Sequence, residues 1–160
     1  MTSSKNKILI TGVAGLIGSH MAEYLVAKGY DVYGIDNLSG GFLENIPKGV
    51  TFYQGDLRNR EWLAETFTKI KPDYVYHLAA YAAEGLSPFI RNFNYSINLL
   101  CSVIFINECI KNEVKKIIFT SSMAVYGKGS PPFKELDQPS PEDPYGISKF
   151  AVEMDLKQAH

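Results

Sequence analysis

The stretch Lys7-Ile8-Leu9-Ile10-Thr11-Gly12-Val13-Ala14-Gly15-Leu16-Ile17-Gly18 decides the fold. Its apolar, β-branched start favours a strand, and three glycines spaced at threes follow it where a helix begins. In such a turn one glycine permits the tight bend, one lets the backbone approach a pyrophosphate, and one lets the helix pack closely on the strand. The helix N-terminus adds N–H donors and partial positive charge. The stretch therefore predicts a dinucleotide-binding turn.

The rest of the chain alternates short strand-like runs with longer helical ones. Strands are expected at 7–11, 31–36, 50–54, 74–78 and 116–121, and helices at 15–28, 59–70, 88–112 and from about 144. In the 88–112 helix, apolar residues recur at threes and fours: Phe89, Phe93, Ile97, Leu100 and Ile104. Such alternation predicts an α/β fold, a doubly wound parallel sheet of Rossmann type with helices on both faces. Asp143 is the expected N-cap of the last helix, with Pro144 at its first position.

Composition narrows the class of protein. A chain of 160 residues with 46% apolar and 21% charged residues fits one globular domain spanning 1–160. The net charge of −1 gives no reason to expect nucleic acid. Uninterrupted apolar runs are shorter than the ~20 residues of a membrane span, and no signal peptide precedes the first strand, so we expect no membrane partner and a cytoplasmic location. Cys101 and Cys109 fall in one predicted helix, too far apart to pair, and are expected to be reduced thiols. No metal site is predicted.

Asp36 ends the second predicted strand, eighteen residues beyond Gly18. A carboxylate there accepts hydrogen bonds from the hydroxyls of an adenosine ribose and repels a 2′-phosphate. No Arg or Lys follows in 37–41 to offset that repulsion, so NAD is favoured over NADP. The alternative is an aspartate that only caps a turn. Asp56, after the third strand, is a candidate for the adenine amino group.

Tyr145 and Lys149 are four residues apart and therefore share one helix face. At about 6 Å an ammonium is expected to lower the pKa of a phenol by roughly two units, which would let Tyr145 act near neutral pH. Ser122 lies at the carboxyl edge of the sheet, where it can donate to a substrate oxygen and relay a proton to Tyr145. The alternatives are an ordinary helix-surface pair and a serine that caps a loop.

These motifs together resemble the extended short-chain dehydrogenase/reductase family, and within it the NAD-dependent nucleotide-sugar epimerases. The resemblance runs over the whole chain. It rests on Thr11-Gly-x-x-Gly-x-x-Gly18, Asp36-Asn37, Gly55-Asp56-Leu57, His77-Leu78-Ala79-Ala80, Asn98, Ser121-Ser122 and Tyr145-x-x-x-Lys149.

The resemblance implies a role for each matching residue. It makes Ser122, Tyr145 and Lys149 catalytic, with Lys149 also on the nicotinamide ribose. It assigns the following residues to NAD: Gly12, Gly15, Leu16, Ile17, Gly18, Asp36, Asn37, Ser39, Gly40, Asp56, Leu57, Leu78, Ala79, Ala80, Asn98, Thr120, Tyr145 and Lys149. We expect His77 to be a satisfied core histidine rather than a catalyst, and Trp62 to pack on its helix rather than stack on a ligand.

The sequence departs from the family pattern at two places. Leu99-Leu100-Cys101-Ser102 stand where a Gly-Thr pair is usual, so local helix packing is expected to differ. Ala82 occupies a position that often holds a lysine, which leaves one phosphate contact in doubt.

The residues after Ser122 bear on the reaction. Related dehydratases place an Asp-Glu pair there, because elimination of water needs an acid and a base beyond the tyrosine. Met123-Ala124 occupy those positions here. The resemblance then implies a 4-epimerase of UDP-sugars such as UDP-glucose and UDP-galactose: transient oxidation to a 4-keto sugar, then reduction from the other face. The alternatives are a sugar or alcohol dehydrogenase or reductase, a dehydratase, and a non-catalytic dinucleotide-binding module.

No sixth strand and no substrate domain precede the end of the sequence at His160. We therefore expect an incomplete NAD-binding domain, truncated before the substrate-binding region and inactive by itself. The helices at 88–112 and from 144 resemble those that pair in homodimers of the family.

Overall fold

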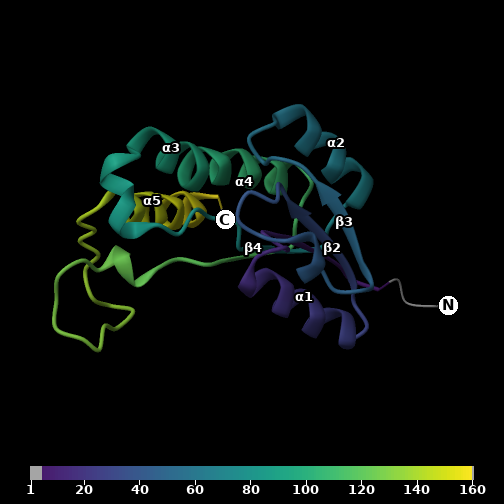
Figure 1. Cartoon of the computed structure of the whole chain (residues 1–160), viewed down its shortest axis with the longest axis horizontal. Coiled ribbons are helices and arrows are strands. Elements are labelled where there is room, and N and C mark those ends of the chain that lie inside the picture. Colours follow the sequence, from purple (N-terminus) through teal and green to yellow (C-terminus); the bar gives the residue numbers. More distant parts are fainter. Residues whose placement is uncertain (1–4, 160) are drawn as a thin grey trace. The chain divides into compact units, whose positions relative to one another are not determined.

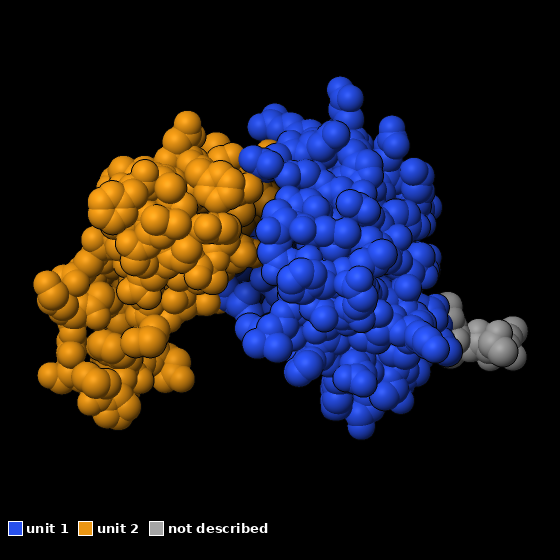
Figure 2. Space-filling view, viewed as in Figure 1, with its two compact units in different colours: residues 1–79, 107–120 blue, residues 80–106, 121–160 orange. Residues whose placement is uncertain are grey.

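A computed structural model describes residues 5–159. Contacts divide the chain into two compact units, shown in different colours in Figure 2. Unit 1 comprises residues 1–79 and 107–120, and unit 2 comprises residues 80–106 and 121–160. The glycine turn therefore belongs to unit 1, and Tyr145 belongs to unit 2.

Unit 1 is built on a five-stranded parallel sheet with the order β3-β2-β1-β4-β5. The strands are β1 (Lys7–Thr11), β2 (Asp31–Asp36), β3 (Val50–Gln54), β4 (Tyr74–His77) and β5 (Lys116–Phe119). Thr11 pairs with Ile35 on one side and with His77 on the other, so the carboxyl ends of the three central strands are aligned. The predicted doubly wound sheet is confirmed.

Helices α1 (Leu16–Ala27) and α2 (Arg60–Ile70) lie on opposite sides of this sheet in Figure 1. The alternation of β1 produces this arrangement, because successive side chains of a strand point to opposite faces. Ile8 and Ile10 belong to the core cluster that includes Ala22 and Leu25 of α1. Between β2 and β3 the chain forms one short 3₁₀ turn, η1 (Leu43–Asn45).

Unit 2 is helical. Its elements are η2 (Glu84–Phe89), α3 (Arg91–Tyr95), the π-helical turn η3 (Ser96–Leu100), the first half of α4 (Cys101–Lys111), η4 (Met123–Val125) and α5 (Pro144–Gln158). The expected start of α5 is confirmed: the Asp143 side chain accepts a hydrogen bond of 2.9 Å from the Gly146 amide, a cap contact worth about 1 kcal/mol.

The predicted 88–112 helix differs most from the structure. It is preceded by the 3₁₀ turn η2, breaks at Ile90, and contains a π turn before α4. Pro88 lies inside η2, and it disfavours a regular α-helix through the residues before it, because it lacks an N–H and restricts the backbone of Ser87. The strands β4 and β5 also end one and two residues earlier than expected.

Three of the five residues in the apolar stripe of this helix are exposed, and Ile97 and Ile104 are partly buried. Phe89, Phe93 and Leu100 are 83%, 45% and 57% exposed, whereas Asn94 and Asn98 are 1% exposed. The periodicity correctly indicates helical structure here, but it does not identify the face that the fold of unit 2 buries. Two asparagines occupy the buried face instead.

The helix Arg91–Lys111 is also long and apolar enough to cross a membrane by length and composition alone. The uninterrupted apolar runs in the sequence do not indicate this, because Asn94 and Asn98 divide them. In this fold 44% of its most apolar window is buried, and core helices of globular proteins pass the same test.

Both cysteines lie on α4 and neither forms a disulfide, as expected. Cys101 belongs to unit 2 and is 6% exposed; Cys109 belongs to unit 1 and is 1% exposed. Burial raises the pKa of the Cys109 thiol well above its usual range.

Candidate functional site

Backbone atoms around the glycine turn of unit 1 leave no room for side chains at two of its glycines. Gly12 has a φ of +73°, and a Cβ there would lie 2.9 Å from the backbone of Ala79. A Cβ at Gly18 would lie 2.1 Å from the Gly12 carbonyl oxygen, and one at Gly15 would lie 3.3 Å from the same atom. Side chains are therefore excluded at the positions where the sequence predicts a tight bend and close helix packing.

The N-terminus of α1 is prepared for an anion. Gly15 is its N-cap and has no side chain to bond the first-turn amides, and no acidic residue stands in that turn. The amides and the helix dipole can then act on a phosphate. Leu16 and Ile17, predicted cofactor contacts, are 77% and 60% exposed at this end of the helix.

Asp36 holds the glycine turn in place. Its carboxylate accepts hydrogen bonds from the amide of Ala14 (3.0 Å) and from the amide of Leu38 (2.8 Å). Each of its oxygens keeps a second lone pair for a ribose hydroxyl. The turn-capping alternative and the ribose-binding prediction are thus compatible in one side chain.

Asp56 is more heavily engaged than the sequence indicates. Its two oxygens accept four hydrogen bonds: from the amide, Nε and a terminal nitrogen of Arg58, and from the side-chain amide of Asn37. These bonds, led by that from the Arg58 side chain, lower the pKa of Asp56 to about 2. An adenine amino group would have to displace one of these donors, since a carboxylate offers about four acceptor positions. Arg58 is a neighbour that the sequence reasoning missed.

The Thr11 hydroxyl joins β1 to the end of β4. It lies 2.8 Å from Nδ1 of His77 and accepts hydrogen bonds from the amides of Leu78 and Ala79, both at 3.2 Å. His77 is 1% exposed and stacks on Phe119, which confirms it as a satisfied core histidine. The sequence analysis gave Thr11 no role beyond the motif. A threonine at the end of a buried strand could have indicated that its hydroxyl bonds to a neighbouring strand.

The other predicted cofactor residues of unit 1 are dispersed around this end of the sheet. Ser39 and Gly40 are exposed in the loop after β2, and Leu57 is 6% exposed. The Thr120 hydroxyl donates to the His77 carbonyl oxygen at 3.3 Å. The Trp62 ring packs against the backbone of Gly55, since a Cβ there would lie 2.2 Å from it, whereas the sequence predicts packing on its own helix. Their contacts to a cofactor stay predictions.

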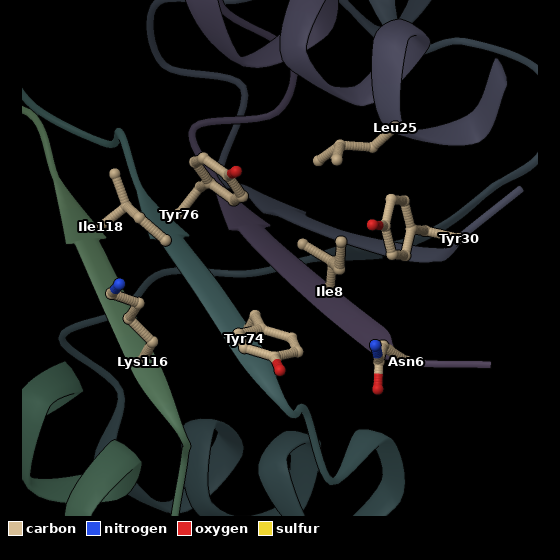
Figure 3. Close-up of a pocket in the computed structure, with 8 residues that line it drawn as sticks. All are labelled: Asn6, Ile8, Leu25, Tyr30, Tyr74, Tyr76, Lys116 and Ile118. Atoms are coloured by element: carbon tan, nitrogen blue, oxygen red, sulfur yellow. The ribbon is translucent and has the colours of Figure 1, made fainter. Parts of the chain in front are cut away.

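A hollow of about 400 Å³ opens elsewhere in unit 1, between the end of α1 and strands β1, β4 and β5 (Figure 3). Its lining includes Ile8, Tyr74 and Lys116, which pair in register in the first half of their strands. It therefore lies at the end of the sheet opposite to Gly12 and Asp36 and is not the predicted site.

In unit 2 the predicted catalytic side chains lie together. Tyr145 is 8% exposed, and Lys149 is 2% exposed with its Nζ 5.8 Å from the Tyr145 ring centroid. The Ser122 side chain acts on the Tyr145 phenol in the direction that lowers its pKa. Its oxygen also caps η4 by accepting a hydrogen bond from the Ala124 amide at 3.1 Å. Ser122 therefore does cap a loop, and this contact is compatible with the predicted catalytic role.

The expected net lowering of the Tyr145 pKa is not found for the protein residues alone. Burial is the largest cause and raises the pKa of Tyr145 above its ordinary value of 10; the Ser122 side chain opposes this, and the charges of Glu84 and Asp143 add to it. Burial lowers the pKa of Lys149 to about 8. The sequence-based reasoning counted the attraction between the two groups and omitted the loss of water around both.

The remaining predicted residues of unit 2 are Ala80, which is exposed, and Asn98, which is buried in a hydrogen-bonded network. Asn98 Oδ1 accepts from the Tyr81 amide at 2.8 Å, and its Nδ2 donates to the Tyr81 carbonyl and to Asn94 Oδ1. Its cofactor contact stays a prediction. Ala82, at the departure from the family pattern, is exposed. Within residues 5–159 no cluster of side chains suits a metal ion.

Three features define the class of dinucleotide-binding oxidoreductases and epimerases. They are a parallel sheet in Rossmann order, a glycine turn at its carboxyl edge and a Ser-Tyr-Lys set. The profile of the NAD dependent epimerase/dehydratase family matches residues 8–160, and the chain belongs to this family. The predicted resemblance is thereby confirmed.

Three relatives illustrate the match. UDP-glucose 4-epimerase of Halalkalibacterium halodurans is 37% identical over 147 residues, which cover 91% of this chain and 44% of that protein. The crystal structure of UDP-glucose 4-epimerase with UDP-glucose from Thermotoga maritima has a TM-score of 0.92 at 37% identity, over 96% of this chain and 50% of that one. The Thermus thermophilus enzyme in complex with NAD also has a TM-score of 0.92 at 37% identity, over 95% and 50%. This chain spans about half the length of the relatives that it matches.

Proposed function

We propose that this chain is the cofactor-binding and proton-transferring part of an NAD-dependent nucleotide-sugar 4-epimerase that acts on UDP-sugars. The observation that carries the proposal is the cluster of Ser122, Tyr145 and Lys149 in unit 2, because a module that only binds a dinucleotide needs no buried phenol next to a buried ammonium. Support also comes from the relatives named above, which are UDP-glucose 4-epimerases.

The residues of unit 1 suit a dinucleotide. A Cβ would fill the cradle at Gly12 and Gly18, and the uncapped first turn of α1 offers amides to the pyrophosphate. Asp36 offers its remaining lone pairs to the adenosine ribose and repels a 2′-phosphate, which favours NAD. When bound, NAD supplies a hydride acceptor that later returns the hydride to the sugar.

The residues of unit 2 then handle the proton. Ionised Tyr145 accepts the proton of the sugar 4-hydroxyl as the C–H hydride leaves, and the phenol returns that proton when the ketone is reduced. Ser122 donates to the reacting oxygen, and protonated Lys149 stabilises the phenolate. Because burial raises the pKa of Tyr145, the protein residues alone leave most of this phenol un-ionised at neutral pH.

The product distinguishes this function from its alternatives. We expect the whole protein, incubated with NAD and either UDP-glucose or UDP-galactose, to form the other 4-epimer without net change in NADH, as followed by NMR and absorbance at 340 nm. A 4-keto-6-deoxy product would identify a dehydratase instead of an epimerase. Formation of NADH in a stoichiometric amount would identify a dehydrogenase. Tight NAD binding without conversion of any sugar nucleotide would support the non-catalytic module.

Tyr145→Phe tests the catalytic assignment itself. Removing the phenolic oxygen should reduce kcat by about 10²–10⁴-fold, the usual worth of a general acid–base group, and leave the Kd for NAD nearly unchanged by calorimetry. Tyr126→Phe is the control, because it removes a phenol that stacks on Phe133 in the same unit without joining the Ser-Tyr-Lys cluster. Normal turnover by Tyr145→Phe would overturn the proposal.

We extend the proposal to a homodimer through unit 2. Phe89, Phe93 and Leu100 expose an apolar stripe, and Ile147 and Met154 of α5 are 38% and 54% exposed. Contiguous exposed apolar side chains are typical of interfaces. Light scattering should give twice the mass of the protomer, and Phe93→Glu should shift it towards the monomer more than Glu135→Lys in the proline-rich loop.

A further inference from the structure

One peptide group in unit 2 is held from both sides by buried side chains that are distant in sequence. The C=O of Pro144 accepts a hydrogen bond of 2.8 Å from Asn94 Nδ2, and the N–H of Tyr145 donates to the Ser87 hydroxyl at 3.2 Å. These two groups belong to the same peptide unit, the one that leads into Tyr145. Ser87 and Asn94 are 0% and 1% exposed.

The orientation of the Asn94 amide is fixed by a chain of hydrogen bonds. The Tyr81 amide can only donate, so it fixes Asn98 Oδ1 on its side, at 2.8 Å. The other terminal atom of Asn98 is therefore Nδ2, which donates to the Tyr81 carbonyl at 3.1 Å and to Asn94 Oδ1 at 2.8 Å. This leaves Asn94 Nδ2 directed at the Pro144 carbonyl.

The Ser87 hydroxyl is constrained in the same manner. It accepts from the Tyr145 amide and therefore turns its own hydrogen towards the Glu84 carbonyl at 2.7 Å or the Asp143 carboxylate at 3.2 Å. Asp143 in turn caps α5 through the Gly146 amide. The first turn of α5 is thus bonded to η2 as well as to α3.

We propose that Ser87 and Asn94 are positioning residues that hold the 144–145 peptide in one orientation and thereby direct the Tyr145 side chain towards Ser122. The proposal rests on the proposed function, because the position of the phenol matters only if Tyr145 transfers a proton. The peptide plane before a residue sets the direction of its Cα–Cβ bond, so a rotation of this plane moves the phenolic oxygen. A misplacement of about 1 Å at a reacting group can cost about 100-fold in rate.

The test uses two variants in the whole protein. Ser87→Ala removes the acceptor of the Tyr145 N–H, and Asn94→Asp keeps the size of the side chain but replaces the donor to the Pro144 carbonyl. Each should lower kcat by at least about tenfold, while KM for the sugar nucleotide and Kd for NAD change less than threefold. If one variant fails to fold, the other carries the test.

Tyrosine ionisation provides a readout that does not depend on turnover. The absorbance titration of each variant minus that of the same variant with Tyr145→Phe isolates the Tyr145 phenol without cofactor. In the unaltered protein this pKa should lie above 10, since burial is the main cause of its shift. In Ser87→Ala and Asn94→Asp it should move back towards 10, because the released phenol regains water.

Thr66→Val is the matched control. It removes another buried hydroxyl, whose bond of 2.8 Å goes to the Trp62 carbonyl one helical turn away in unit 1. It should lower the melting temperature without altering kcat or the titration of Tyr145. If Ser87→Ala and Asn94→Asp behave like this control, the proposal is overturned. If Tyr145→Phe retains normal turnover while the titration still shifts in both variants, the proposed function fails and the positioning of the phenol stands.

Discussion

The two units place functional groups in opposite ways. In unit 1 the turn that carries Gly12 and Gly18 works by the absence of side chains, and backbone amides do the binding. In unit 2 the Tyr145 and Lys149 side chains are withdrawn from water. The peptide group that precedes Tyr145 is held by two buried polar side chains. The turn in unit 1 buries no polar side chain and adds little unfavourable free energy to folding. The arrangement in unit 2 opposes folding, because burial removes water from polar side chains.

This difference determines how each unit responds to change. A site made of backbone tolerates loss of a side chain and is blocked by addition of one. Removal of a buried ionised group relieves its desolvation penalty and also removes its chemistry, as in other stability–activity trade-offs. Each of the following substitutions tests one side of that contrast.

Lys149→Met should stabilise the protein at pH 7. The pKa of Lys149 falls from 10.5 to about 8 on folding, a difference equivalent to about 3 kcal/mol. Below pH 8 the whole penalty is present. Between about pH 8 and 10.5 the unfolded chain binds more protons than the folded one, so the stability of the unaltered protein rises with pH and the advantage of Met disappears.

Urea unfolding at pH 7 and at pH 9.5 measures this advantage. Lys128→Met is the control, because its ammonium lies in an exposed ion pair with Glu142 and should give little difference at either pH. An equal gain at both pH values would show that Met packs better and that Lys149 carries no desolvation penalty.

Gly18→Ala should destabilise unit 1 by about 1–3 kcal/mol, the usual cost of an inserted methyl group that does not fit. The new Cβ would lie 2.1 Å from the Gly12 carbonyl oxygen, and backbone cannot rotate away as a side chain can. The sign is informative, since Gly→Ala inside a helix otherwise stabilises by about 0.5–1 kcal/mol.

Gly40→Ala supplies the comparison in the same urea experiment, because nothing lies within 4 Å of its added Cβ. Its stability should stay within about 0.5 kcal/mol of the unaltered protein. A stable Gly18→Ala protein would mean that the turn is not sterically closed.

Asp36→Ala should have the smallest effect, a reduction of about tenfold in the preference for NAD over NADP, from loss of a charged hydrogen bond to the ribose and of the repulsion of a 2′-phosphate. Calorimetric titration with both dinucleotides measures it. Glu23→Ala, an exposed change of the same charge on α1, should leave the ratio unaltered. A ratio that Asp36→Ala leaves unaltered would mean that Asp36 only caps the turn.

The sequence is informative about unit 1 because its constraints are local. The bend at Gly12 and the helix start at Gly15 depend on neighbouring residues, so spacing alone predicts them, and the order of strands follows from the alternation with helices. Asp56 illustrates the limit: its saturation by Arg58 and Asn37 combines a local contact with one from nineteen residues away.

Unit 2 could be predicted only in part. The Tyr145–Lys149 spacing is local and was visible, as was the Asp143 cap. Ser87 and Asn94 meet the 144–145 peptide across 58 and 50 residues, and nothing in their own neighbourhood indicates such a contact. The exposure of Phe89 and Phe93 could not be predicted for the same reason, because it depends on contacts between distant residues. Helical periodicity does not distinguish a face that packs within the unit from one that does not.

Each unit contains one buried cysteine, whose alkylation can report on transient opening of that unit. A buried thiol reacts with an alkylating reagent only when its surroundings open, and Cys101 and Cys109 fall in different units although they share α4. The ratio of their alkylation rates therefore compares the opening frequencies of the helical unit and the sheet unit within one molecule, and no probe has to be introduced.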